Sequence, residues 1–159
     1  MIAHLKEISE SGVQVLWQTG KGYIEAARKA AEPFMSERLV VTDFVARMDL
    51  AYAMADLVIS RAGASSISEL CLLGKPAILV PSPNVTEDHQ THNAMALVNK
   101  NAAVLVKDAD AEQNMISTAL QLITDETKLS ELSKNVSLLA QRDSANRIAD
   151  EVVKLIKTK

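Results

Sequence analysis

Cysteine and aromatic residues are scarce in this sequence. Its single cysteine, Cys71, excludes an intrachain disulfide and a thiolate-rich zinc site, and it suits a reducing compartment. One tryptophan, two tyrosines and two phenylalanines are spread along the chain, too few and too scattered to form a surface on which nucleic-acid bases could stack.

The sequence also lacks an excess of positive charge and any long hydrophobic run. With 17 Lys and Arg against 20 Asp and Glu, the net charge is −3 at pH 7, so we expect no nucleic-acid partner. No apolar run approaches the roughly 18 residues that a membrane-spanning helix needs. The first residues, which include Glu7 and Glu10, show no secretory signal, and we expect a cytoplasmic protein.

What the chain does contain is the composition of a soluble globular protein, with 48% hydrophobic and 23% charged residues. A chain of this length can bury roughly 70% of the surface that its unfolded form exposes. We therefore expect one domain with its own core, spanning residues 1–159.

Short apolar runs alternate with helical patterns through the first two thirds of the chain, which is typical of βαβ units in a parallel sheet. The expected strands are Val13–Gln18, Leu39–Thr42, Leu57–Ser60, Ala77–Val80 and Ala103–Val106. The expected helices between them are Tyr23–Ala31, Met48–Ala55, Ser66–Leu73 and Gln90–Lys100. Because each strand is short and apolar at consecutive positions, helices should cover both of its faces, and the pattern predicts a three-layer, doubly wound α/β domain.

The two ends of the chain depart from this alternation. A helical segment at Ile2–Glu10 comes first, whereas a doubly wound domain normally begins with a strand whose following turn binds the ligand, so we expect that first strand to be absent. Three helices follow at Ala111–Thr124, Thr127–Ala140 and Ser144–Lys157, and we expect them to cover one edge of the sheet. The last is apolar on one side and basic near its end, which fits a solvated helix or a membrane surface.

The turn after the third strand is the most informative candidate site. Small residues in Arg61-Ala62-Gly63-Ala64-Ser65-Ser66 allow a ligand to approach the backbone, and the free N–H groups of the following helix favour a phosphate. Glu69 lies about one turn further, where its carboxylate could accept hydrogen bonds from a vicinal diol such as ribose. Ser66-Ile67-Ser68-Glu69 also fits a capping box, and spacing alone favours that role.

Other turns carry weaker signals. Thr19-Gly20-Lys21-Gly22 lacks the spacing of a Walker P-loop or a dinucleotide fingerprint, and no Gly-x-Ser-x-Gly elbow is present. The polar run Glu87–Asn93 fits a helix start that hydrogen-bonds a substrate; a metal site at Asp88, His89 and His92 is the weaker alternative, because a third convincing ligand is missing. We expect a structural role for His4.

With these turns identified, the chain resembles the C-terminal half of the MurG family of bacterial N-acetylglucosaminyltransferases. The resemblance covers nearly the whole chain. It is carried by Gln18-Thr19-Gly20-Lys21-Gly22, by Phe44 to Glu69 with its core Ala55-Asp56-Leu57-Val58-Ile59-Ser60-Arg61-Ala62-Gly63-Ala64, by Gly74-Lys75-Pro76-Ala77 and by Asp88-His89-Gln90-Thr91-His92-Asn93-Ala94.

The resemblance implies the C-terminal domain of a GT-B glycosyltransferase, which binds the donor UDP-N-acetylglucosamine. It implies that Glu69 holds the ribose hydroxyls, which reverses the preference from spacing. The other implied roles are the diphosphate for Gly63, Ala64, Ser65 and Ser66, the uracil edge for the backbone at Phe44 and Val45, the sugar hydroxyls for Gln90 with His89, and the diphosphate charge for Arg61.

The resemblance also implies the reaction and the partners. In the whole enzyme, lipid I would accept N-acetylglucosamine with inversion to give lipid II, with no metal and no cofactor. The acceptor and membrane-binding N-terminal domain is expected to be missing here, so the lipid I partner and membrane contact would come through that domain at the inner membrane, and this chain would not catalyse transfer alone. A stand-alone donor-binding subunit of a two-chain glycosyltransferase, a UDP-N-acetylglucosamine 2-epimerase and a non-catalytic binding module stay open as alternatives.

Overall fold

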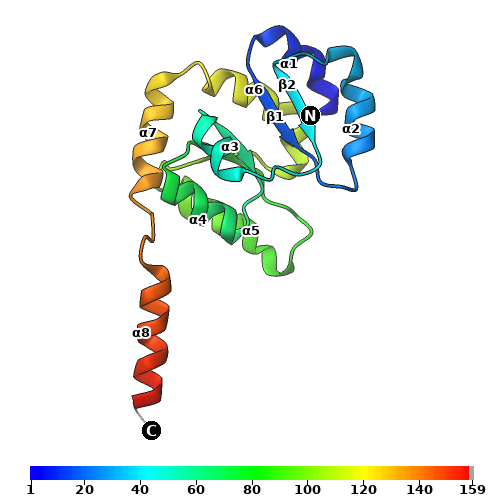
Figure 1. The fold of residues 1–159 in the computed structure, drawn as a ribbon. Helices are drawn as coiled ribbons and strands as arrows, with labels where there is room; N and C mark the ends of the chain where they lie inside the picture. Colours follow the sequence, from blue (N-terminus) through cyan, green and yellow to red (C-terminus); the bar gives the residue numbers. More distant parts are fainter. Residues whose placement is uncertain (158–159) are drawn as a thin grey trace.

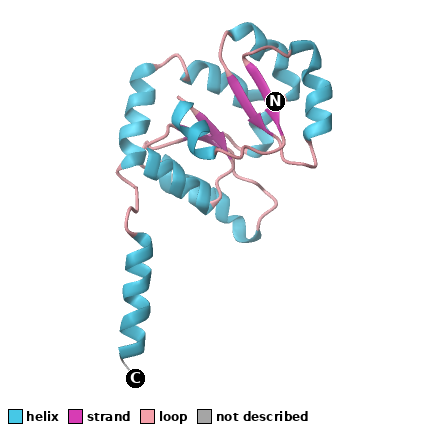
Figure 2. Ribbon diagram, viewed as in Figure 1, coloured by secondary structure: helices cyan, strands magenta, loops and turns pink. Residues whose placement is uncertain are grey.

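Short apolar segments form the strands of the fold, close to the positions that the alternating pattern predicts. The computed structural model describes residues 1–157. In it the strands are β1 (Val15–Gln18), β2 (Leu39–Thr42), β3 (Val58–Ser60), β4 (Ala77–Leu79) and β5 (Val104–Leu105). Every strand pairing is parallel, which confirms the α/β class (Figure 2).

The strands form two hydrogen-bonded groups. β1 pairs with β2, and β3, β4 and β5 pair in that order. Over residues 1–157 no ladder joins the two groups, so the sheet is less continuous than the strand pattern suggests. Because the strands within each group are parallel, their carboxyl ends gather at one edge, where ligands bind in open α/β sheets.

The helices follow the expected order. They are α1 (Leu5–Ser11), α2 (Ile24–Ala31), α3 (Met48–Met54), α4 (Ala64–Leu73), α5 (His89–Val98), α6 (Ala111–Leu122), α7 (Glu126–Ser137) and α8 (Ser144–Lys157). Short 3₁₀ helices lie at η1 (Ile2–His4), η2 (Glu32–Phe34), η3 (Thr86–Asp88) and η4 (Asp108–Asp110).

The core is thickest around β4. Its neighbouring residues Ile78 and Leu79 belong to different clusters of buried side chains, so both faces of β4 are covered. Leu79 packs with residues of α4, α5 and α7, and Ile78 packs with residues of β5, α6 and α7. The predicted three-layer arrangement is therefore correct for this strand.

β1 and β2 are covered on one face. Leu39 and Val41 pack with Leu5 of α1 and with Ile24 and Ala27 of α2. Val40, which lies between Leu39 and Val41, and its β1 partner Leu16 point to the other face and are each 49% exposed. Side chains alternate across a strand, and no buried cluster among the described residues receives the second set, so the prediction of two covered faces is wrong here.

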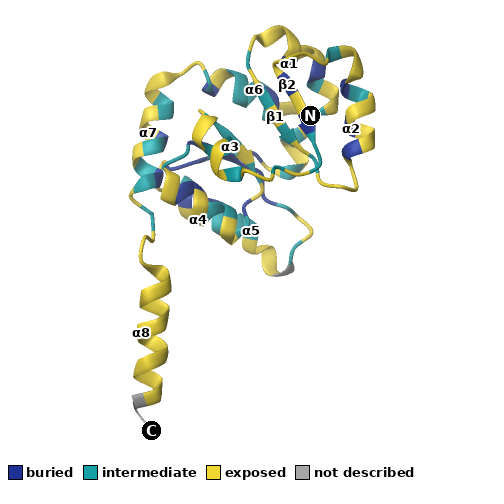
Figure 3. Cartoon of the chain, in the orientation of Figure 1, coloured by how far each residue is buried: buried dark blue, intermediate teal, exposed yellow. Residues whose placement is uncertain are grey.

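The last helix does not join the domain core. α8 extends away from the rest of the chain (Figure 1), and its side chains are exposed from Ser144 to Ile156 (Figure 3). Ile148 and Leu155 are 65% and 74% exposed. The expectation that this helix covers a sheet edge is wrong, whereas α7 does pack: Ser133 Oγ donates to the Gly74 carbonyl at 2.7 Å. None of the helices in the described part of the chain is long and apolar enough to cross a bilayer.

Candidate functional site

The start of α4 exposes backbone donors at the carboxyl end of β3. Gly63 is the N-cap residue, and the first helical hydrogen bond runs from the Ile67 N–H to the Gly63 carbonyl at 3.0 Å. The amides of Ala64, Ser65 and Ser66 consequently have no acceptor within the helix. Ala64 and Ser65 are exposed, so these donors and the positive end of the helix dipole can meet an anion.

The α4 start also decides against one of the two roles left open for Glu69. A capping box would need Ser66 as the N-cap residue, but the helix begins two residues before Ser66 and no side chain caps it. Glu69 instead accepts a hydrogen bond from the Tyr52 hydroxyl at its Oε2 atom, at 3.1 Å. The capping-box alternative is therefore wrong, and the exposed carboxylate lies in the second turn of the helix that presents the free amides.

The turn before α4 is held by α5. Asn93 donates from Nδ2 to the carbonyl of Ala62 at 3.1 Å, and Ala62 is fully buried. This bond fixes the backbone immediately before the Gly63 N-cap, and it brings α5 against the start of α4.

Arg61 faces β4 and η4. Its guanidinium donates to the backbone carbonyls of Val80 and Pro81, each at 3.2 Å, and it forms an ion pair with Asp108. In this conformation the side chain ties together the carboxyl ends of β3 and β4. Its role at a diphosphate stays a prediction. The three acceptors all contact Nη1 of Arg61, so a diphosphate would have to bind through Nε or Nη2.

The loop that contains Phe44 and Val45 is tied to the end of β1. The Val45 N–H donates to Gln18 Oε1 at 2.8 Å, and the Thr42 hydroxyl donates to the Phe44 carbonyl at 3.1 Å. Phe44 is 66% exposed. With the Val45 N–H occupied, its carbonyl is the backbone group better placed to meet the predicted uracil edge.

Gln90 and His89 lie in the first turn of α5. The Ser82 N–H donates to Gln90 Oε1 at 2.9 Å, so this side chain holds the loop after β4. Gln90 precedes Asn93 by three residues and therefore lies on the same side of the helix as the residue that reaches the α4 turn. His89 is exposed.

The residues just before α5 have an unusual backbone. Glu87 and Asp88 both have positive φ angles, 56° and 51°. Residues other than glycine rarely adopt this backbone region. Asp88 accepts a hydrogen bond from the Thr91 hydroxyl at 2.6 Å. Within the described residues, no group of three His, Cys, Asp or Glu side chains could hold a metal ion, so the alternative metal site at Asp88, His89 and His92 gains no support.

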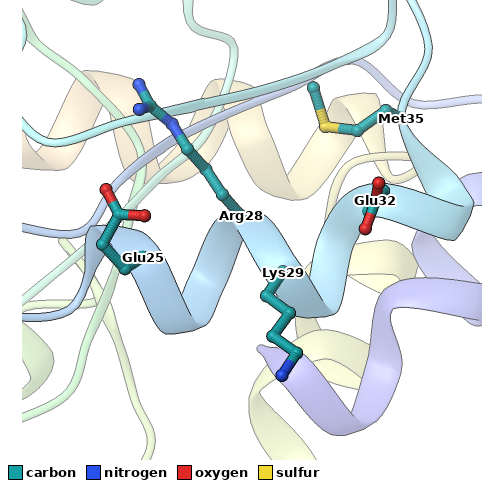
Figure 4. Close-up of a pocket in the computed structure, with 5 residues that line it drawn as sticks. All are labelled: Glu25, Arg28, Lys29, Glu32 and Met35. Atoms are coloured by element: carbon teal, nitrogen blue, oxygen red, sulfur yellow. The ribbon is translucent and has the colours of Figure 1, made fainter.

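Two surface depressions of the described chain lie away from the start of α4. One, of about 430 Å³, lies over α2 and η2 and is lined by Glu25, Arg28, Lys29, Glu32 and Met35 (Figure 4). A second, of about 330 Å³, lies between the C-terminal end of α4 and the middle of α7. None of the predicted site residues lines either one.

Four contributors to this edge had no signal in the local sequence patterns. Each forms a hydrogen bond with a residue of the site or of its turn: Tyr52 with Glu69, Asn93 with Ala62, Gln18 with Val45 and Asp108 with Arg61. Gln18, Tyr52 and Asn93 do lie within the stretches that carry the family resemblance, whereas Asp108 lies outside them. Their roles depend on contacts between distant segments, which spacing along the chain does not reveal.

Known proteins are similar to this chain in sequence and in fold. Residues 1–150 match the family model described as Glycosyltransferase family 28 C-terminal domain. Proteins from Parabacteroides distasonis and Bacteroides fragilis are 57% and 58% identical to the chain, each over 98% of its length. A protein from Cytophaga hutchinsonii is 50% identical over 98% of the chain. All three are named UDP-N-acetylglucosamine--N-acetylmuramyl-(pentapeptide) pyrophosphoryl-undecaprenol N-acetylglucosamine transferase.

The fold matches a solved structure of the same kind. The crystal structure of Acinetobacter baumannii MurG superimposes with a TM-score of 0.77 at 26% sequence identity, over 96% of this chain and 48% of that one. The chain spans 41–42% of the length of the three curated relatives. These matches confirm the resemblance to the MurG family and the fold of a GT-B C-terminal domain. The chain thus belongs to glycosyltransferase family 28, and it carries the C-terminal domain of that family.

Proposed function

We propose that this chain is the donor-binding part of an inverting N-acetylglucosaminyltransferase, with UDP-N-acetylglucosamine as its ligand. One observation carries the proposal: the amides of Ala64, Ser65 and Ser66 have no acceptor within α4, and the accessible Glu69 carboxylate follows in the next turn of the same helix. The names of the close relatives support this choice of donor.

The diphosphate lies at the α4 start in this proposal. Two or three backbone N–H groups can donate to its oxygens, and the helix dipole favours its negative charge. Each hydrogen bond to a charged group contributes about 1.5–3 kcal/mol. Small side chains at Gly63 and Ala64 leave room for the phosphate oxygens to reach the backbone.

The rest of the donor follows from this placement. Glu69 accepts hydrogen bonds from the two ribose hydroxyls, because a carboxylate has several acceptor positions and no donor when ionised. The backbone at Phe44 and Val45 meets the uracil edge. Gln90, with His89 beside it, meets the hydroxyls of the sugar, while its Oε1 atom keeps the loop at Ser82 in place.

The reaction joins the sugar to a lipid-linked acceptor. The C4 hydroxyl oxygen of the muramoyl sugar in lipid I attacks the anomeric carbon of N-acetylglucosamine, and the bond from that carbon to the UDP oxygen breaks. The electron pair leaves with UDP, and the hydroxyl proton passes to a base that we place outside this chain. The α4 amides, with Arg61 as a further donor, stabilise the charge that develops on the departing diphosphate.

The lipid acceptor places this reaction at a membrane. We propose that lipid I and the inner membrane, on its cytoplasmic face, are met through an N-terminal domain such as the longer relatives have room for, since the chain spans 42% of the length of the Parabacteroides relative. The transferase names of the relatives favour this reading over a 2-epimerase.

Calorimetric titration of UDP and UDP-N-acetylglucosamine into the 159-residue chain tests the proposal. We expect both ligands to bind, and we expect Glu69→Gln to weaken both about tenfold or more, because a carboxylate is a stronger acceptor than an amide. Glu25→Gln, on the far surface of α2, is the matched control and should leave both affinities unchanged. Absence of binding, or equal losses in the two variants, would overturn the proposal.

A further inference from the structure

One side chain from a separate helix contacts the carboxylate that we assign to the ribose. Tyr52 lies on α3 and donates its hydroxyl to Glu69 Oε2 on α4, at 3.1 Å. The sequence separates these residues by 17 positions. Because both lie within helices, the bond joins two regular elements at the edge where the α4 amides are exposed.

The Tyr52 ring is anchored below this contact. It packs against the buried cluster that contains Leu70 and Cys71 of α4. Burial, followed by the hydrogen bond and the charge of Glu69, raises the pKa of Tyr52 to about 12. The hydroxyl therefore keeps its proton at neutral pH, and it donates to a carboxylate that can only accept.

The contact leaves most of the Glu69 carboxylate free. An ionised carboxylate has about four acceptor positions on its two oxygens, and Tyr52 occupies one of them on Oε2. An exposed glutamate without a partner samples many rotamers, and ordering it on binding costs conformational entropy. A glutamate already held by a neighbour loses less freedom when a diol arrives.

We propose that Tyr52 is a positioning residue of the donor site, which holds Glu69 so that its remaining acceptor positions face the two vicinal hydroxyls of a nucleoside diphosphate. The inference rests on the proposed function, since it needs Glu69 to bind ribose. It adds a residue of α3 to the site. Because α3 follows the loop that contains Phe44, this helix connects that loop with the carboxylate of Glu69.

A purely structural link between α3 and α4 would act differently. Such a link would affect every nucleotide equally, whether or not its ribose carries hydroxyls. A positioning role affects ligands with both hydroxyls and leaves ligands without them unchanged. The comparison of UDP with 2′,3′-dideoxy-UDP therefore separates the two roles.

The experiment measures the dissociation constants of both nucleotides for the wild-type chain and for Tyr52→Phe, which keeps the ring and removes the hydroxyl. We expect Tyr52→Phe to bind UDP about three- to tenfold more weakly and dideoxy-UDP with unchanged affinity. Tyr23→Phe is the matched control, because Tyr23 lies just before α2 and contacts Trp17 rather than Glu69. It should change neither constant.

The outcomes distinguish the positioning role of Tyr52 from the binding of ribose by Glu69. If wild type binds UDP more tightly than dideoxy-UDP and Tyr52→Phe keeps the same ratio, the positioning role is overturned and the proposed function stands. If wild type binds neither nucleotide, or binds both equally, the assignment of Glu69 to ribose fails, and the role of Tyr52 fails with it.

Discussion

The side chain of Asn93 donates to the carbonyl of Ala62 at 3.1 Å and so links α5 to the turn that begins α4. Ala62 is fully buried, so its carbonyl depends on this donor. The link connects the helix that carries Gln90 with the helix that carries the free amides and Glu69.

Removal of this link should lower both stability and ligand affinity. In Asn93→Ala the buried Ala62 carbonyl loses its donor, and we expect the free energy of unfolding to fall by about 1–3 kcal/mol. UDP affinity should fall as well, because the backbone before Gly63 is no longer held. Urea denaturation and calorimetry measure the two effects. Asn99→Ala, an exposed asparagine at the end of the same helix, is the control, and a loss of equal size there would contradict the assignment.

Gln90 should discriminate between the nucleotide and the nucleotide sugar. We expect Gln90→Ala to weaken UDP-N-acetylglucosamine about tenfold, through loss of hydrogen bonds to the sugar, and to change UDP affinity little. Parallel titrations of the two ligands measure this difference. Gln113→Ala, an exposed glutamine of α6, should affect neither. Equal losses for both ligands would show that Gln90 acts only by holding the Ser82 loop.

Gly74 ends α4 in a left-handed conformation, with φ at 62°. A side chain in this conformation is strained by about 1–2 kcal/mol. A Cβ atom at this position would make only ordinary van der Waals contact with α7, 3.5 Å from Ser137 Cβ, so the expected cost comes from the backbone conformation. We expect Gly74→Ala to lower the melting temperature by several degrees. Gly22→Ala, where a Cβ would meet open space, should be nearly neutral in the same thermal scan.

His4 should give the fold a pH-dependent contribution. Its Nδ1 atom lies 2.8 Å from Glu7 Oε2, and its Nε2 atom contacts the Glu112 carbonyl, which links the N-terminal helices to α6 and confirms a structural role. Two oxygen acceptors require protons on both ring nitrogens. The hydrogen bond to Glu7, and then the one to the Glu112 carbonyl, raise the pKa of His4 above its ordinary value of 6.5.

The sign of the pH effect follows from this raised pKa. The stabilisation is fully present below pH 6.5, where the unfolded-state histidine is also charged, and it is lost as the pH rises through the higher folded-state pKa. We expect His4→Ala to cost about 0.5–1 kcal/mol at pH 6 and less at alkaline pH. Denaturation of both proteins across this range measures it. A constant difference at all pH values would show that His4 acts without its charge.

Local patterns in the sequence predict the elements well. β2 and α8 have the expected ends, and the other strands differ by one or two residues, because β-branched runs and helical periodicity are local properties. The start of α4 shows where such patterns mislead. Ser66 and Glu69 fit a capping box by spacing, but Gly63 ends the preceding extended segment earlier, and the helix begins at Ala64.

The partners of the site residues could not be predicted in this way. Glu69 meets Tyr52 across 17 positions, Ala62 meets Asn93 across 31 and Arg61 meets Asp108 across 47. These contacts arise from the packing of α3, α5 and η4 around β3 and β4. The amphipathic pattern of α8 likewise predicts a helix with an apolar side, but it does not predict whether that side packs against the domain core.

The most direct test of the central claim is the backbone amide spectrum of the isotope-labelled chain during titration with UDP. Binding of the diphosphate at the start of α4 predicts the largest changes in chemical shift at Ala64, Ser65 and Ser66, with smaller changes at the α2 surface near Arg28. Saturable changes confined to other segments, with these three amides unmoved, would contradict the account.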